Sequence, residues 1–172
     1  ASLRRHEILI GQDPADLEIL AQQIAVLFQM NREQNLFSIF EGAVHSGEQE
    51  LKDLLANHRL LEVQWVCNRF TDVFGEEARP YAYECTILFF GMVQHLSIAY
   101  RTAHEDTLDS IIFVRTALRH IEGILPKMIE SKIVLLDVGQ VKFLETKLSK
   151  SVVTKEIITT RLQGFYARLN EI

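Results

Sequence analysis

The sequence has few of the residues that interrupt or cross-link a fold, with 2 cysteines, 3 prolines and 8 glycines among 172 residues. Cys67 and Cys85 form no CxxC pair and lie within apolar helical patterns, so we expect reduced, buried side chains rather than a disulfide framework. The longest apolar run, Ile87 to Val93, is too short to span a membrane, and no secretory leader opens the chain. These features predict a cytoplasmic protein with no membrane partner.

Motifs for catalysis and metal binding are also missing from the sequence. None of the 6 histidines lies four residues from another, and there is no HExxH, no GxSxG and no glycine-rich phosphate loop. A net charge of −5 argues against binding nucleic acid through the overall field of this chain. We therefore predict no catalytic residues, no metal and no cofactor. An enzyme on a helical scaffold would require an acid and a base that converge in one cleft.

Apolar residues recur at helical spacing along most of the chain, and no β alternation persists beyond a few residues, which predicts an all-α bundle of about six to eight helices. The expected helices cover residues 1–10, 13–29 with an Asp13-Pro14 start, 32–45, a segment after Ser46 that resumes past Asn57 and closes at Gly75, 81–101, 107–125 and a long stretch from Val138 onward. Asn31 to Glu33 is expected to break the second helix, and Pro126 to end the helix before it or to open the next one. Residues 133–136 suit either a short strand or part of a helix.

The segment from Tyr81 to Arg101 organises this scheme, because it is apolar on two sides at the same period. Such a helix must be covered on two sides, by its own core and by something else, so we expect burial on nearly every side. Glycine within a helix costs about 1 kcal/mol relative to alanine. Gly91 therefore indicates close approach of another backbone or of a ligand. A helix packed inside a single large bundle is the simpler alternative.

Six aromatic residues come from successive predicted helices: Phe37, Phe40, Trp65, Phe70, Phe89 and Phe113. With Asn68, Gln94 and His95 interleaved among them, this cluster suits an apolar ligand pocket with a few polar groups. It equally suits an ordinary core. On the helix expected over residues 107–125, Arg119 and Glu122 are spaced to form an ion pair.

Three stretches together resemble the C-terminal regulatory domain of the TetR/AcrR family of bacterial transcriptional repressors, over roughly residues 13–125. They are NREQNLFSIFEGAVHSGEQELKDLLANH, FGEEARPYAYECTILFFGMVQHLSIAYR and IIFVRTALRHIEGIL. The second resembles the penultimate helix of that family and the third resembles its last helix. On this interpretation residues 1–12 are the end of a linker helix, residues 13–125 are the regulatory and dimerisation domain, and residues 126–172 are a C-terminal helical extension packed on it.

The resemblance implies a homodimer in which the last two family helices form a four-helix bundle with the partner. The interface residues it implies are Glu84, Ile87, Gly91, His95, Ile98, Ile111, Val114, Leu118 and Ile121. It also implies a small, mostly apolar effector, whose pocket would be lined by Phe37, Phe40, Leu61, Trp65, Asn68, Phe89 and Val93. The N-terminal DNA-binding module of the family has no counterpart in these residues, so DNA binding is expected only of an intact protein that carries one. The alternative is a helical protein–protein interaction module with no small-molecule ligand.

Overall fold

The computed structural model describes residues 2–33, 49–104, 109–136, 142 and 146, and within them every regular element is helical. The elements are α1 (Ser2–Leu9), α2 (Leu17–Glu33), α4 (Gln49–Phe74), a 3-10 helix η1 (Glu76–Ala78), α5 (Ala82–Ala103) and α6 (Ser110–Ser131). This confirms the all-α class. The helix expected over residues 32–45 lies almost wholly outside the described residues, as does nearly all of the stretch after Val138, so the helix count and the TetR-like topology stay predictions.

The start of α2 lies later in the chain than the Asp13-Pro14 signal predicts. Asp13 Oδ1 accepts a 2.8 Å hydrogen bond from the Ala15 amide and so closes a turn before the helix. The capping role belongs to Asp16, whose Oδ1 accepts a 2.7 Å bond from the Glu18 amide. The predicted break at Asn31 to Glu33 is also wrong, because α2 continues to Glu33.

Helix α4 is continuous where the sequence suggested an interruption at Asn57. One buried stripe runs along it through Leu55, Val63, Val66 and Phe70. Gly75 ends the helix as expected. It has a φ of 88°, in the left-handed region that glycine adopts without steric cost, and its amide donates to the Thr71 carbonyl at 2.9 Å.

Pro126 lies inside α6, so the prediction that it ends or begins a helix there is wrong. A proline within a helix costs about 3 kcal/mol or more through the lost amide and the clash with the preceding turn. Packing offsets this cost, since Leu125 is buried and Met128 and Ile129 pack against the core. The helix ends at Ser131, after which Lys132 adopts a φ of 55°. Residues 133–136 form neither strand nor helix.

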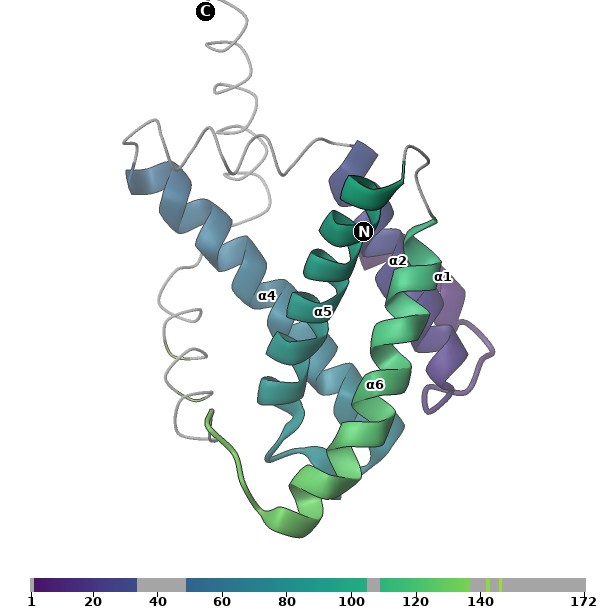
Figure 1. The fold of residues 1–172 in the computed structure, drawn as a ribbon, viewed down its shortest axis with the longest axis vertical. Coiled ribbons are helices and arrows are strands. Elements are labelled where there is room, and N and C mark those ends of the chain that lie inside the picture. The colour runs from purple at the N-terminus through teal and green to yellow at the C-terminus, as the bar shows by residue number, and fades with distance from the viewer. Residues whose placement is uncertain (1, 34–48, 105–108, 137–141, 143–145, 147–172) are drawn as a thin grey trace, which may run out of the picture.

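The core lies between α2, α4, α5 and α6 (Figure 1). Helix α6 packs against α2 and against α5, α5 packs against α4, and α1 packs on α2. Phe70 and Phe89, both fully buried, meet edge to face with ring centroids 5.9 Å apart. Further fully buried apolar side chains come from all four helices, among them Leu20, Ile24, Val66, Cys85, Val114, Ala117, Leu118 and Ile121.

In the single chain helix α5 is buried on one side only, so the expected cover on its second side stays a prediction. Its buried residues are Ala82, Cys85, Thr86, Phe89 and Val93. The opposite side faces solvent in the single chain. None of the described helices is long and apolar enough to cross a membrane.

Candidate interface on helices α5 and α6

The solvent-facing side of α5 carries an apolar surface with two polar residues. Ile87, Leu88 and Ile98 are 39%, 41% and 46% exposed, which is high for large aliphatic side chains. At 100° per residue, Glu84, Gly91 and His95 lie at the middle of this side, opposite the buried one. The predicted seam residues of the central helix are thus the centre of its outer face.

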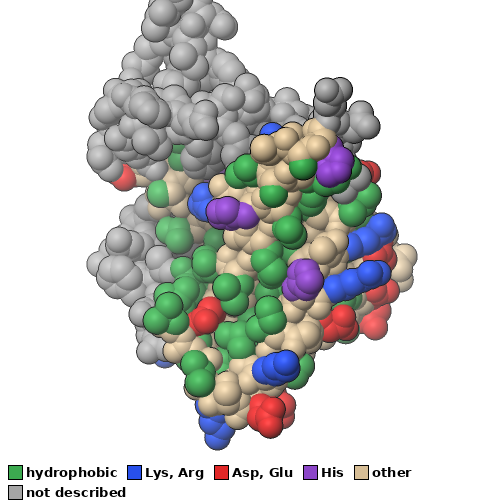
Figure 2. Space-filling view, in the orientation of Figure 1, with side chains coloured by type: hydrophobic (Ala, Val, Ile, Leu, Met, Phe, Trp, Pro, Cys, Tyr) green, Lys and Arg blue, Asp and Glu red, His purple; other side chains and the backbone are tan. Residues whose placement is uncertain are grey.

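Helix α6 adds Ile112 and Ile124, which are 44% and 37% exposed. Because α5 and α6 run side by side, their exposed apolar residues form one two-helix surface, which we call the α5–α6 face (Figures 1 and 2). Figure 2 shows hydrophobic side chains gathered over this face, with histidines and an acidic side chain among them and further charges of both signs toward its edges. An apolar patch of this kind on a folded chain commonly marks an interaction site.

Two mid-helix glycines lie on this face, Gly91 in α5 and Gly123 in α6. A Cβ placed on either one would meet no atom of the described residues within 4 Å. Neither glycine has a positive φ, so the helical backbone does not require glycine at either position. Packing among the described residues therefore does not account for either glycine, although each costs the helix about 1 kcal/mol relative to alanine.

Five of the nine predicted interface residues lie on this face: Glu84, Ile87, Gly91, His95 and Ile98. Ile111 is half-buried and packs against the core. Val114, Leu118 and Ile121 are 0%, 1% and 0% exposed. These three belong to the chain's own core, so their assignment to an interface is corrected. The sequence analysis did not predict Ile112 and Ile124. The apolar stripe through Val114, Leu118 and Ile121 is more pronounced and was assigned to the interface in their place.

The two polar residues of α5 are held by hydrogen bonds. Glu84 Oε2 accepts bonds of 2.6 and 3.0 Å from the backbone amides of Leu135 and Leu136, which fixes the segment after α6 against the start of α5. His95 Nδ1 donates to the Gly91 carbonyl at 2.8 Å, because a carbonyl oxygen can only accept. The Nε2 atom of His95 is thus left as the acceptor when the ring is neutral.

The predicted effector-lining residues do not come together in the described part of the chain. Phe89 and Val93 are 0% and 3% exposed and belong to the core, whereas Leu61 is 55% exposed and Asn68 is also exposed. Asn68 Oδ1 accepts a long 3.4 Å bond from Gln64. Phe37 and Phe40 lie outside the described residues. The effector pocket therefore stays a prediction.

Trp65, another predicted lining residue, belongs to a polar network that fastens α1 to the bundle. The Arg5 guanidinium lies 4.0 Å from the Trp65 ring centroid, and Arg5 Nη1 donates to Glu62 Oε2 at 2.7 Å. Gln23 donates to the Arg5 carbonyl at 2.7 Å and accepts from Arg69 Nε at 3.1 Å. The polar residues of this network lie far apart in the sequence and form no motif, so the sequence did not predict it.

Arg69 completes the network on the α4 side. It is only 5% exposed, and it donates to the Pro14 carbonyl and to Asp72 Oδ2, each at 2.8 Å. A buried guanidinium is tolerated only when its donors are satisfied in this way. The contact joins α4 to the turn before α2, so the position of α1 and α2 depends on a polar contact as well as on the apolar core.

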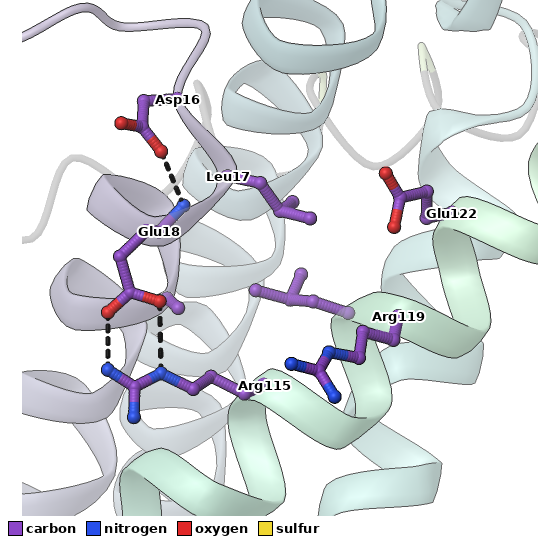
Figure 3. A pocket seen from close by; sticks show the side chains of 8 residues that line it. Asp16, Leu17, Glu18, Arg115, Arg119 and Glu122 are labelled. Carbon is purple, nitrogen blue, oxygen red and sulfur yellow. Dashed lines mark hydrogen bonds and ion pairs between the residues drawn. The ribbon is translucent and has the colours of Figure 1, made fainter.

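A cavity of about 320 Å³ lies between the first turn of α2 and the middle of α6 (Figure 3). Arg115 closes one side of it through two hydrogen bonds, from Nε to Glu18 Oε2 at 2.9 Å and from Nη2 to Glu18 Oε1. The bonds to Arg115 lower the pKa of the Glu18 carboxyl below its ordinary value, against a smaller opposing effect of burial. The residues that line the cavity are Asp16, Leu17, Glu18, Ala21, Arg115, Leu118, Arg119 and Glu122.

Cys67 and Cys85 are both buried. Burial raises the pKa of the Cys85 thiol to about 12, with smaller contributions from Glu84 and Cys67. Its Sγ lies 3.6 Å from Met128 Sδ, which places it in an apolar contact between α5 and α6. Such a thiol is unreactive at neutral pH. Among the described residues, no three histidine, cysteine or acidic side chains group as metal ligands.

Comparison of the chain with protein-family models, with curated proteins and with solved structures finds no match.

Proposed function

We propose that this chain is the effector-sensing and dimerisation domain of a TetR-like transcriptional repressor, and that two copies pair through the α5–α6 face. The observation that carries the proposal is the exposed apolar surface of α5 and α6, with a glycine in each helix that the chain itself does not explain. Close approach of a partner backbone is the usual reason for glycine at a helix–helix contact.

A second copy suits this face better than an unrelated partner. Two 22-residue helices side by side offer a footprint of roughly 33 by 20 Å, near the ~800 Å² per partner of a stable interface. Consecutive helices that each expose one apolar side form a four-helix bundle when they meet a copy of themselves. Glu84 on this face is already engaged by two amides, which lowers the cost of covering its charge.

In the intact repressor, the dimer would hold two recognition helices at half-sites about 34 Å apart. A small, mostly apolar effector would act by binding one arrangement of the two copies more tightly than the other. The effector part of the proposal is supported by the resemblance in sequence alone, because the predicted lining residues do not come together in the described part of the chain.

The alternative, a helical protein–protein interaction module with no small-molecule ligand, is favoured by one observation. The predicted lining residues in the described part are divided between the core, as for Phe89 and Val93, and the surface, as for Leu61 and Asn68. In that case the α5–α6 face would bind a different protein, and the chain alone would stay a monomer.

Sedimentation equilibrium over a wide concentration range, on the wild type and on Gly91→Leu, tests the pairing. Position 91 has open space among the described residues, so we expect the leucine variant to keep its fold and to place a bulky side chain in the middle of the face. We expect a wild-type dimer that Gly91→Leu weakens by at least about tenfold. Leu61→Ala, which changes an exposed apolar residue of α4 outside the face, is the matched control and leaves the dimer intact. A wild type that is monomeric at every concentration would exclude the dimer.

A further inference from the structure

The cavity between α2 and α6 has a floor and a rim of different chemistry. Ala21 and Leu118, each 1% exposed, form an apolar base, and the half-buried Leu17 side chain stands beside them. Charged groups from both helices surround this base (Figure 3). Its volume of about 320 Å³ is at the small end of the ~300–1,000 Å³ usual for ligand sites. A ligand here would be small, with an apolar part and a polar part.

Two of the charged groups are already satisfied by each other. Glu18 and Arg115 form a two-bonded ion pair across the helices, and together they are neutral. Asp16 uses Oδ1 to cap α2 through the Glu18 amide at 2.7 Å. These contacts hold the α2 side of the cavity in place, so Asp16, Glu18 and Arg115 form its wall and are not free to bind a ligand.

Arg119 and Glu122 differ, because within the described residues neither side chain has a hydrogen bond or an ion pair. Their spacing along α6 would allow them to pair, yet Figure 3 shows the guanidinium and the carboxylate apart from each other along one side of the cavity. One unpaired cation and one unpaired anion therefore border the same apolar base. The sequence prediction of an Arg119–Glu122 ion pair is not met by any contact in the structure.

We propose that this cavity binds a free α-amino acid with an apolar side chain. The ligand carboxylate accepts hydrogen bonds from the Arg119 guanidinium, whose planar donors match a carboxylate. The ligand ammonium pairs with Glu122, and the side chain covers Leu17 and Leu118. A simple anion would face two carboxylates, from Glu122 and Asp16, and a simple cation would face the Arg119 guanidinium. A zwitterion satisfies both charges at once.

This site is separate from the predicted effector-lining residues, and it does not depend on pairing through the α5–α6 face. Isothermal titration with L-leucine and L-phenylalanine tests it on the wild-type chain. Three probes each lack one feature of the ligand: leucinamide lacks the carboxylate, 4-methylpentanoate lacks the ammonium, and glycine lacks the side chain. We expect saturable binding of at least one of the two amino acids, and binding of each probe weaker by at least about tenfold.

Two variants identify the residues that bind. Arg119→Gln and Glu122→Gln each remove one charge while keeping a side chain of similar length, and each is expected to weaken binding by about tenfold or more. Arg101→Gln on α5 and Glu130→Gln on α6 change exposed residues outside the cavity and are expected to bind as the wild type does. Circular dichroism confirms that each variant is folded.

Absence of saturable heat up to about 10 mM amino acid would overturn the proposal. Equal affinity for the amino acid and for all three probes would overturn it as well, since the two charges and the apolar base would then have no role. Unchanged affinity in both Arg119→Gln and Glu122→Gln would place any binding elsewhere on the molecule.

Discussion

Phe89 is buried in the core but was also predicted to line the effector pocket. A core residue should lose much stability when it is truncated and a pocket residue little, so Phe89→Ala distinguishes the two roles. The ring is 0% exposed and meets Phe70 and Phe90 edge to face, with centroids 5.9 and 5.6 Å away. Removing a buried phenylalanine typically costs about 3–5 kcal/mol, which combines lost burial with the cavity that remains. The two aromatic contacts place Phe89→Ala in the upper half of that range.

The assay is urea unfolding followed by circular dichroism, at one fixed protein concentration so that association contributes equally to each variant. A loss of about 3–5 kcal/mol corresponds to a fall in Tm of about 6–20 °C for a chain of this size. Leu61→Ala is the matched control, because Leu61 was predicted to line the same pocket but is 55% exposed. It should change the free energy of unfolding by no more than about 0.5 kcal/mol. A loss of unfolding free energy below about 1 kcal/mol for Phe89→Ala would refute the core assignment and favour the prediction that Phe89 lines a pocket.

Three further predictions concern single polar or ionisable groups. Glu84→Gln weakens the acceptor of two backbone amides, and hydrogen exchange at Leu135 should accelerate while exchange in the middle of α5 stays unchanged. Arg69→Met removes the charged donor to Gln23 from a buried network, and urea unfolding should show a loss of about 1.5–3 kcal/mol. The folded pKa of Cys85 lies near 12, above its value in the unfolded chain, so its contribution to stability is complete below pH ~8.5 and is lost as the pH rises toward 12. Stability should therefore fall by up to about 1.4 kcal/mol per pH unit above pH ~9, and Cys85→Ala should flatten that slope.

Helical spacing alone predicted the all-α class and the approximate positions of α1, α5 and α6. It succeeded because a long apolar stripe at a period of 3.6 residues forms one continuous face on a helix and would be scattered over both faces of a strand. The local signals for the starts and ends of helices were less dependable. Asp13-Pro14 carries the signals of a helix start, but Asp16 lies nearer the first buried residues and caps the helix instead. Pro126 was expected to mark a helix boundary, but the apolar residues on both sides of it keep α6 continuous.

The residues predicted for the interface are exposed on α5 but mostly buried on α6, and packing explains the difference. On α5 the less apolar side, with Glu84 and Gly91, faces outward. On α6 the strongest stripe, through Val114 and Ile121, was expected to face a partner, but it fills the chain's own core. A sequence pattern shows how many apolar sides a helix has. It does not show which side the same chain covers, because that depends on where α2 and α4 pack.

The α5–α6 face is tested most directly by hydroxyl-radical footprinting at low and high protein concentration, with oxidation at each residue read by mass spectrometry. We expect Ile87, Leu88, Ile98 and Ile112 to become protected as the concentration rises through the dimerisation range, whereas the exposed Leu61 of α4 should react equally throughout. Unchanged oxidation of the face in a sample that does dimerise would show that the copies meet elsewhere. That result would exclude pairing through the α5–α6 face.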